Sequence, residues 1–536
     1  MPSRKRAWAL VLLLAVVALV IGVRLRLLDV PLERDEGEYA YLGQLMLDGV
    51  PPYQAAFNMK LPGTYEAYAL IMALFGQTAV GIHLGLLGVD LASIALLYFV
   101  GQRLLDKEGA AVAAATFGLL ALSPQTFGQA AHATHFVVLA ALAGLVALFQ
   151  AQDSGRLVWY FSSGLFFGLS FLAKQPGLAF GLLGVILIWR TESRKDLPAR
   201  KTLRAKTGLF GAGLVLPFAL TCLALWQAGV FERFWFWTMT YASVHGKAMP
   251  PGWGAANFIS YFRHLGADAY FWILAGVGFL GLIKDADEPE RRFTIVGLFG
   301  FSLFAVVPGF YFSPHYFVMM LPALGLLTGS AAVRMRRVLE SSKPAWTWMP
   351  GAAWVAGALW LTTAHEAIFF RLDPNRVARE IYGANPFPEA VEIGRYLETH
   401  SKPEDRVAIL GSEPEICFYA HRRSASGYIY MYDLVQPQPY AAAMRLEFMS
   451  DVEREKPAYV VFVRIPFSWS WDPGTTPLLQ WGEHYVQDQY RLCGVVTIED
   501  KGADFYWDES VKMVTSWPEQ FIAVYRRRQD LPAPRP

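Results

Sequence analysis

The chain has 536 residues, of which 54% are hydrophobic and 17% are charged, against roughly 25% charged residues in an average soluble domain. This composition excludes an ordinary soluble protein and predicts a membrane protein. The net charge of +2 gives no electrostatic reason to expect a nucleic-acid partner.

The chain opens with a basic stretch, Arg4 to Arg6, and an apolar run that continues to about residue 28. No small-x-small cleavage site precedes Arg24, so we interpret the run as an uncleaved first transmembrane span rather than a signal peptide. A helix needs roughly 20 apolar residues to cross a bilayer core of about 30 Å. By this criterion we expect about eleven spans, near residues 7–28, 79–100, 108–122, 135–150, 157–173, 176–190, 207–228, 269–283, 293–311, 315–333 and 346–366.

Lysine and arginine predict the orientation of these spans. If the basic N-terminus is cytoplasmic, the basic loops 190–206, 284–292 and 334–343 are cytoplasmic too, as the positive-inside rule requires. An odd number of spans then places residues 31–63 and everything after Arg371 outside the cell membrane. The sequence therefore predicts a multi-pass protein of the inner or plasma membrane with an extracytoplasmic C-terminal part.

The first outer loop, residues 31–63, is rich in carboxylates: Glu33, Asp35, Glu36, Glu38 and Asp48. Asp35 and Glu36 open a predicted helix, where acidic side chains also suit the helix dipole. A second amphipathic stretch, residues 64–76, follows before the next span. We expect two helices that lie along the membrane and hold the two carboxylates in a partly dry cleft, where a carboxylate can act as a base.

Three further places in the chain offer cations or aromatic groups on the same side. Lys60 precedes Pro62, which restrains the backbone, and it can bind a phosphate or simply snorkel to the interface. Residues 157–190 are too long for one crossing and must turn at "KQPG", which puts Lys174 at the outer mouth. His315 and Tyr316 open a late span.

Two pairs of residues have more than one interpretation. His132 and His135 are three apart, so on a helix they share a face, as paired metal ligands would. Interfacial hydrogen bonding is the favoured alternative, and a metal would need Asp35 or Glu36 as third ligand. Arg24 and Arg26 end the first span on the outer side, against the positive-inside bias, so we expect a local anionic partner such as Asp29 or Glu33.

The remaining segments are a long outer loop and a soluble domain. Residues 229–268 contain "FERFWFWTMTY", which suits an interfacial helix. Residues 372–527 alternate helical patterns with short apolar runs, which predicts a small mixed α/β domain after a membrane domain of residues 1–371. The tail, residues 528–536, is rich in proline and predicted to be disordered. Cys417 and Cys493 could pair, although free thiols are favoured.

The order of these motifs resembles the GT-C membrane glycosyltransferases. "DEGEYAYLGQLML" after the first span, "NMKLPGTYEAYALIMALFG" before the second, the "KQPG" turn and "HYFVMMLPALGLL" in a late span cover most of residues 1–366. The nearest branch holds the protein O-mannosyltransferases and the lipid A aminoarabinose transferases, similar to bacterial glycosyltransferase family 39. The resemblance implies an all-α polytopic membrane domain of GT-C type with juxtamembrane helices, followed by the α/β extracytoplasmic domain.

The resemblance also implies a reaction. A sugar would move, with inversion, from a polyprenyl-phosphate donor held in the membrane lipid to a hydroxyl of an extracytoplasmic lipid, glycan or protein. Asp35, beside Glu36, would accept the proton of that hydroxyl. Lys60, with Lys174 and Arg24 or Arg26, would hold the lipid phosphate. The same site is expected to include substrate contacts at Tyr39, His315 and Tyr316.

The chain departs from the family pattern at two positions. Glu38 stands where aminoarabinose transferases carry an arginine, and "HATH" with His135 stands where many relatives have an acidic residue. The cofactor is therefore left open between none and a divalent metal ion. Two hypotheses of other classes are a non-enzymatic transporter or lipid flippase, and a scaffold for envelope assembly. Inverted repeats would favour the transporter hypothesis, and no such repeat is visible in the sequence.

Overall fold

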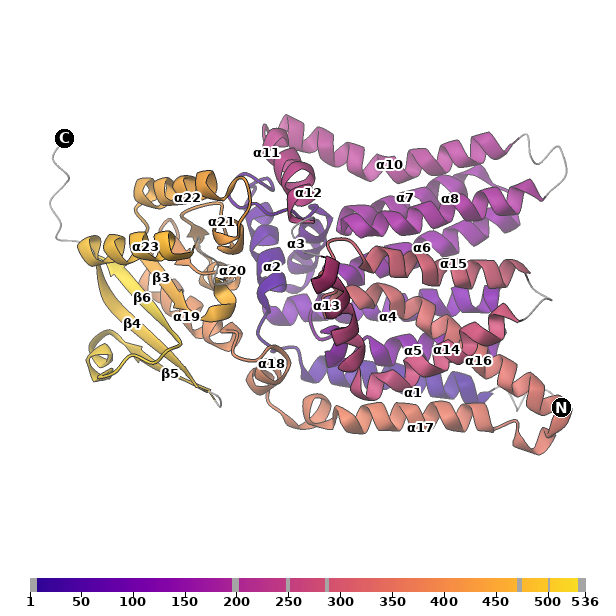
Figure 1. The fold of residues 1–536 in the computed structure, drawn as a ribbon. Coiled ribbons are helices and arrows are strands. Elements are labelled where there is room, and N and C mark those ends of the chain that lie inside the picture. The colour runs from indigo at the N-terminus through magenta and orange to yellow at the C-terminus, as the bar shows by residue number, and fades with distance from the viewer. Residues whose placement is uncertain are drawn as a thin grey trace.

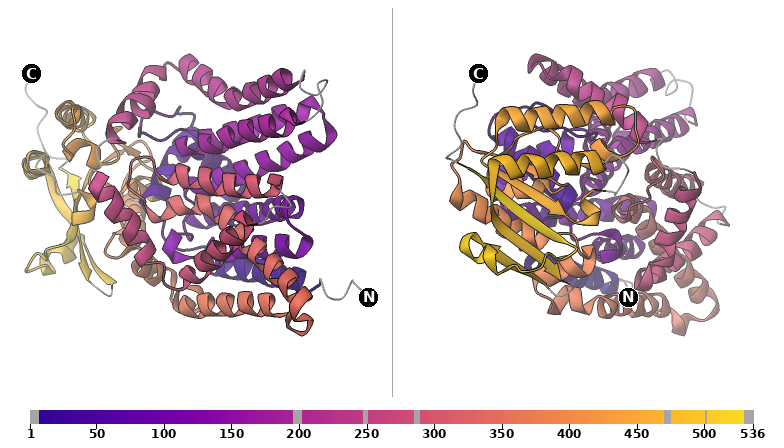
Figure 2. Two further views of the ribbon diagram at one scale, coloured as in Figure 1. Left: turned by 45° about the vertical axis from the view of Figure 1, so that its right-hand side comes forward. Right: turned by 60° about the vertical axis from the view of Figure 1, so that its left-hand side comes forward.

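The computed structural model describes residues 7–194, 202–246, 251–284, 289–469, 475–499 and 502–528. Long helices from the first 371 residues lie side by side with roughly parallel axes, and the C-terminal α/β part lies across one end of them (Figure 1). The right-hand view of Figure 2 shows the sheet in front of that end of the bundle. The expected fold class, a helical membrane part with a small α/β domain, is confirmed.

Among the described residues, eleven helices coincide with the predicted spans. They are α1 (Ala7–Arg26), α4 (Ala79–Leu104), α5 (Lys107–Leu120), α6 (Ala133–Ser154), α7 (Leu157–Ala173), α8 (Leu178–Ser193), α10 (Leu203–Gln227), α14 (Ala269–Ile283), α15 (Pro289–Val306), α16 (Leu321–Ser342) and α17 (Met349–Ala364). Six of them, α1, α4, α6, α10, α14 and α16, are long and apolar enough to cross a membrane. The chain is thus a multi-pass membrane protein, and the number of crossings stays a prediction. Parts of two loops predicted to be cytoplasmic, residues 195–201 and 285–288, lie outside the described residues.

Small residues let the central helices approach closely. Every residue of α5 from Glu108 to Leu120 is buried. A Cβ added at Gly325 of α16 would lie 2.5 Å from the carbonyl oxygen of Ala113, and one at Gly329 would lie 2.4 Å from that of Gly109. Close backbone approach through small residues is the usual packing device of membrane helices, where lipid gives no hydrophobic drive for association.

The turn at "KQPG" is confirmed. Helix α7 ends at Ala173, Lys174 is extended, the short helix η3 (Gln175–Gly177) follows, and α8 begins at Leu178. Pro176 lies in that short helix, where its missing N–H costs no intrahelical hydrogen bond. Lys174 therefore lies at the end of the bundle that faces the α/β part.

The first loop forms the two predicted helices, α2 (Arg34–Leu47) and α3 (Gly63–Phe75). Glu33 caps α2, because its side chain accepts a hydrogen bond from the backbone N–H of Glu36. In return, the side chain of Glu36 accepts a hydrogen bond from the backbone N–H of Glu33. Helix α2 runs across the end of the bundle (Figure 1), and ten of its residues, from Glu36 to Leu45, are buried between the bundle and the α/β part rather than presented to lipid. Gly37 shows how tight this is, since a Cβ there would lie 2.5 Å from Cβ of Glu415.

The long loop after α10 is helical, as predicted. It contains α11 (Phe231–Trp235), the π-helical turn η4 (Phe236–Tyr241), α12 (Ala242–His245) and α13 (Pro251–Arg263). Trp237 and Tyr241 are buried rather than presented to lipid. The loop packs against the α/β part through Tyr241, whose hydroxyl donates to Asp433 at 2.8 Å.

The α/β part contains a six-stranded mixed sheet in the order β2-β1-β3-β6-β4-β5. Its elements are α18 (Pro374–Tyr382), α19 (Phe387–His400), β1 (Arg406–Leu410), α20 (Pro414–Ala420), β2 (Arg423–Ser424), α21 (Tyr432–Val435), α22 (Ala441–Glu455), β3 (Tyr459–Arg464), α23 (Thr475–Gln489), β4 (Tyr490–Glu499), β5 (Gly502–Trp507) and β6 (Phe521–Arg527). Strand β1 pairs in parallel with β2 and β3, and the other pairings are antiparallel. Cys417 and Cys493 are free buried thiols.

The boundaries predicted at residues 371 and 527 are kept as a proposal. The π-helical turn η8 (Ala367–Arg371) ends where the membrane part was expected to end, and β6 ends at Arg527. Of the predicted disordered tail, only Arg528 is among the described residues.

Candidate active site

A cavity of about 520 Å³ lies where the first loop, the helix bundle and the α/β part meet. Five of the residues singled out in the sequence line it together: Asp35, Lys60, Lys174, His315 and Tyr316. They come from segments far apart in the chain. The α/β part closes the cavity with Tyr430, Tyr432 and Asp433.

Asp35 lies in the first turn of α2 with each carboxylate oxygen facing a different group. Oδ1 accepts a hydrogen bond from Nζ of Lys60 at 2.8 Å. Oδ2 lies 3.9 Å from Nδ1 of His132 and 3.9 Å from Nε2 of His315. Burial alone would raise the pKa of Asp35, but Lys60 holds it well below its ordinary value. Asp35 is therefore an ionised carboxylate that borders the cavity.

Lys60 is shared between two carboxylates. Besides Asp35, its Nζ donates to Oε2 of Glu38 at 2.5 Å, and it lies 4.6 Å from the centre of the Tyr39 ring. Glu38 is fully buried and also accepts from the hydroxyls of Tyr65 and Tyr430. The positive charge of Lys60 is thus already balanced. Tyr39 lies beneath Lys60 and is not part of the cavity lining, so it does not contact a substrate there.

The sequence did not predict that Glu38 belongs with Asp35 and Lys60. It drew attention only because aminoarabinose transferases carry an arginine at that position. A signal was present, because residues three apart on a helix share a face, which places Glu38 beside Asp35. Two carboxylates on one face need a cation between them, and Lys60 is the first lysine or arginine that follows them in the sequence.

Lys174 is the cavity's other lysine, and within the described ranges no carboxylate lies within ion-pair distance of it. Its Nζ lies 4.0 Å from the centre of the Tyr316 ring. Burial lowers the pKa of Lys174 to about 7, although Asp35 raises it. Lys174 is therefore the cation of this cavity best placed to gain from an anionic ligand.

His132 and His315 stack with ring centres 4.1 Å apart. His132 is 1% exposed, and neither of its ring nitrogens has a hydrogen-bond partner. Ligand atoms of Asp35, His132 and His315 all lie within 4.8 Å of one another. Two imidazoles and a carboxylate form a donor set that suits zinc or another borderline divalent ion, so these three residues fit a metal.

The predicted pairing of His132 with His135 is wrong. Helix α6 begins at Ala133, so His132 precedes it and the helical three-residue spacing does not apply. His135 instead lies inside the bundle, with Nδ1 3.0 Å from Oδ1 of Asp90. The metal-binding candidate that the sequence missed is His315, which was assigned to substrate.

Arg24 and Arg26 do not line the cavity, so we do not include them in the proposed phosphate site. Arg24 is 3% exposed, pairs with Oδ2 of Asp90 at 2.5 Å and donates to the carbonyl oxygens of Ala121 and Gln129. Its anionic partner is therefore Asp90 rather than Asp29 or Glu33. Arg26 donates to the carbonyl oxygens of Ile368 and Leu372 and so fastens α1 to the start of the α/β part.

Glu36 is also displaced from the reaction. It is 1% exposed, accepts a hydrogen bond from the backbone N–H of Ala131 at 2.6 Å and lies 3.3 Å from Nε2 of His83. Glu36 thus anchors α2 to the bundle and does not line the cavity, so we do not include it in the proposed reaction. Adjacent residues on a helix point about 100° apart, so the side chains of Asp35 and Glu36 face different directions.

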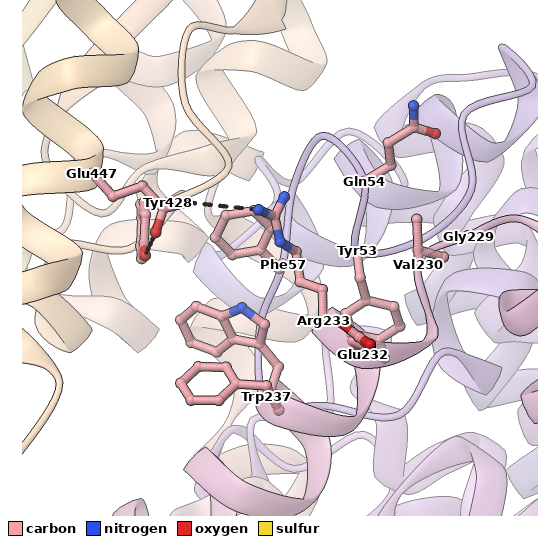
Figure 3. A pocket seen from close by; sticks show the side chains of 11 residues that line it. Tyr53, Gln54, Phe57, Gly229, Val230, Glu232, Arg233, Trp237, Tyr428 and Glu447 are labelled. Carbon is pink, nitrogen blue, oxygen red and sulfur yellow. Dashed lines mark hydrogen bonds and ion pairs between the residues drawn. The ribbon is translucent and has the colours of Figure 1, made fainter.

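A second cavity, of about 510 Å³, lies between the long loop and the α/β part. Figure 3 shows Arg233 of α11 facing Glu447 of α22 across it, with Phe57, Trp237 and Tyr428 beside them. Arg233 lies 3.6 Å from Glu447, which also accepts from the hydroxyl of Tyr428 at 2.7 Å. Because these charges satisfy one another, we place the chemistry in the first cavity.

Comparison with known proteins shows which chains and folds this protein is similar to. Residues 62–220 match the family model described as dolichyl-phosphate-mannose-protein mannosyltransferase. The structure aligns with ArnT from Cupriavidus metallidurans bound to undecaprenyl phosphate, at a TM-score of 0.57 and 15% identity, over 98% of this chain and 99% of that one. The chain has the GT-C fold. The resemblance stated from the motifs is thereby confirmed.

Three further proteins are similar to this chain. The undecaprenyl phosphate-alpha-4-amino-4-deoxy-L-arabinose arabinosyl transferase of Pseudomonas aeruginosa is 27% identical over 63% of this chain, and the match spans 62% of that relative's own length. The lipopolysaccharide core galacturonosyltransferase RgtB of Rhizobium johnstonii is 25% identical over 62% of this chain and 68% of its own length. The oligosaccharyltransferase of Archaeoglobus fulgidus shares the fold at a TM-score of 0.56 and 14% identity, over 95% of this chain and 75% of that one.

Proposed function

We propose that the protein is an inverting glycosyltransferase that moves a sugar from a polyprenyl-phosphate donor to a hydroxyl of an extracytoplasmic acceptor. One observation carries the proposal: a single cavity holds an ionised carboxylate, Asp35, and a cation without a carboxylate partner among the described residues, Lys174. In the proposed orientation the N-terminus is cytoplasmic and the α/β part lies outside. The printed names of the relatives, which act on undecaprenyl-phosphate-linked or lipopolysaccharide sugars, support it.

In the proposed reaction Asp35 accepts the proton of the acceptor hydroxyl while that oxygen forms a bond to the anomeric carbon. The bond between this carbon and the phosphate oxygen breaks, and the polyprenyl phosphate leaves with the bonding electrons. Lys174 stabilises the charge that develops on the phosphate. Glu38 gives Lys60 a second partner, so the ammonium stays paired when Asp35 becomes protonated.

The sugars in the relatives' names are an amino pentose and a uronic acid. Both donors would present an anomeric carbon beside a phosphate, and these are the parts that Asp35 and Lys174 address. We therefore propose sugar transfer as the class of reaction, with pentose and hexose donors both allowed by this pair of residues.

Transfer of radiolabelled sugar from an undecaprenyl-phosphate donor by the purified protein in detergent tests the proposal. A flippase or transporter would bind the lipid and leave the donor intact, whereas the enzyme releases undecaprenyl phosphate in step with acceptor labelling. Binding without release, across donors carrying a pentose and a hexose, would decide for the non-enzymatic alternative.

We also propose that Asp35, His132 and His315 hold a divalent transition metal ion. The unpartnered ring nitrogens of buried His132 support this, because a buried polar atom without a partner is costly. When bound, the ion would add positive charge beside the reacting carboxylate.

Metal content measured by mass spectrometry after dialysis against zinc or manganese checks the assignment. Wild type is expected to retain about one equivalent, and His132→Ala is expected to lose it, because two ligands rarely hold an ion tightly. His135→Gln serves as the matched control, since His135 faces Asp90, and it should retain the ion. Loss in both variants, or in neither, contradicts the proposed ligands.

Lys174→Gln should weaken binding of undecaprenyl phosphate by about tenfold or more, since a hydrogen bond to a charged group contributes roughly 1.5–3 kcal/mol. The matched control is Lys107→Gln, which removes an exposed lysine outside the cavity. Affinity can be measured by displacement of a fluorescent polyprenyl phosphate. Equal affinity in the two variants would remove Lys174 from phosphate binding.

The same assay has an expected pH dependence. Because the pKa of Lys174 is about 7, the free protein carries the protonated lysine below pH 7 and loses it above. Phosphate favours the protonated form, so affinity should fall as pH rises from 7 to 9, by up to tenfold per unit. The titratable groups around Lys174 are Asp35, Lys60, Glu38, His132, His315 and Tyr316. In Lys174→Gln this slope should be absent.

A further inference from the structure

The strongest observation outside the proposed reaction is a buried carboxyl group contributed to the cavity by the α/β part. Asp433 lies in α21, is 5% exposed and lines the cavity that holds Asp35. The hydroxyl of Tyr241, from the π-helical turn η4, donates to its Oδ1 at 2.8 Å. The side chain is therefore fixed in position by a neutral donor.

Asp433 differs from the other acids around the cavity in having no counter-charge. Asp35 and Glu38 share Lys60, and Glu413 pairs with Arg34 at 3.1 Å. Within the part of the chain that the structure describes, no lysine, arginine or histidine lies within ion-pair distance of Asp433. Burial raises the pKa of Asp433 to about 7, although the hydrogen bond from Tyr241 and the charge of Lys60 lower it in part.

Asp433 and Lys174 enter the cavity from different parts of the fold. The titratable groups that interact with Lys174 include Asp35, Lys60, Glu38, His132 and His315, whereas those that interact with Asp433 include Tyr241, Glu38 and Lys60. Both residues line the same cavity, Lys174 from the end of the helix bundle and Asp433 from the α/β part. A saccharide with its phosphate at Lys174 and its anomeric carbon near Asp35 would place the groups remote from the phosphate, or the acceptor, toward Asp433.

We propose that Asp433 is a specificity-determining carboxylate that binds a protonated amine carried by one of the two saccharide substrates. This rests on the proposed glycosyl transfer and adds the chemical class of its substrate. A hydroxyl would leave the buried charge uncompensated, whereas an ammonium group supplies both a hydrogen bond and the missing opposite charge. Tyr241 fixes one oxygen, so the other is available to the amine.

Paired ligands that differ only in the amine test the proposal by calorimetric binding to the full-length protein. The donor pair is undecaprenyl phosphate-4-amino-4-deoxy-L-arabinose and undecaprenyl phosphate-L-arabinose. The acceptor pair is octyl glucosaminide and octyl glucoside. Wild type is expected to bind the amine member of one pair at least about tenfold more tightly than its neutral partner, and the pair that shows this identifies the substrate that carries the amine.

Asp433→Asn should reduce that preference to within about twofold while leaving affinity for the neutral member unchanged. Its amide oxygen can still accept from Tyr241, and thermal unfolding checks that the variant folds. Asp488→Asn is the matched control, because Asp488 is exposed on α23 and loses the same charge in the same domain. A preference that survives Asp433→Asn, or its absence from both pairs in wild type, overturns the proposal. Failure to transfer sugar with the preference intact would instead count against the glycosyltransferase function alone.

Discussion

Asp35→Asn is expected to fold, to bind undecaprenyl phosphate, and to lose at least about two orders of magnitude in turnover, because a positioned base contributes typically 10²- to 10⁴-fold. The amide has the shape of the carboxylate but cannot take the acceptor proton. Turnover is measured as sugar transfer from an undecaprenyl-phosphate donor at saturation, and binding as displacement of a fluorescent lipid phosphate.

The control for this variant is Asp48→Asn. Asp48 belongs to the same loop and caps the far end of α2, but its side chain is 51% exposed and lies outside the cavity. The control removes one negative charge near the site and should keep close to full activity. Undiminished turnover in Asp35→Asn would exclude Asp35 from the mechanism.

Arg24→Met should destabilise the fold strongly without changing phosphate binding. Removing one partner of a buried ion pair costs about 3–5 kcal/mol, since the remaining charge is left uncompensated. Here that charge is Asp90, 1% exposed inside the bundle beside His135. The folded fraction should bind undecaprenyl phosphate as wild type does, because Arg24 does not line the cavity.

A second substitution separates loss of a structural pair from loss of a phosphate ligand. Arg24→Met combined with Asp90→Leu replaces both charges with apolar groups and is expected to recover much of the stability, since apolar replacements of buried ion pairs are often neutral. Thermal unfolding in detergent measures both variants. If phosphate affinity falls in the stable double variant, Arg24 is a phosphate ligand after all.

The helices and the turn could be predicted from the sequence because they follow from local patterns. Apolar runs of bilayer length and the proline of "KQPG" fixed the positions of the helices and of Lys174 within a few residues. The α/β part was also predictable, since its short apolar runs alternate with amphipathic stretches. These signals depend on neighbours in the chain and not on the tertiary fold.

The partners of the charged residues could not be predicted in this way. Arg24 pairs with a residue 66 positions away, and the cavity combines Asp35 with His315 and Asp433. Such pairs depend on which helices meet. Glu36 and His135 do not line the cavity for a more local reason. Both residues lie in the helices where the sequence placed them. Each lies in the first turn of its helix, and a shift of one residue in the start of a helix changes the face on which a side chain lies.

The burial of α2 has a consequence for engineering. Gly37 leaves no room for a side chain against Glu415, Arg34 donates to the carbonyl oxygen of Ser412, and the hydroxyl of Tyr430 donates to the carbonyl oxygen of Arg34. The helix that presents Asp35 is therefore held in place partly by residues after position 371. A chimaera that exchanges the α/β part between relatives must therefore exchange α2 as well, because the contact surfaces of the two are complementary.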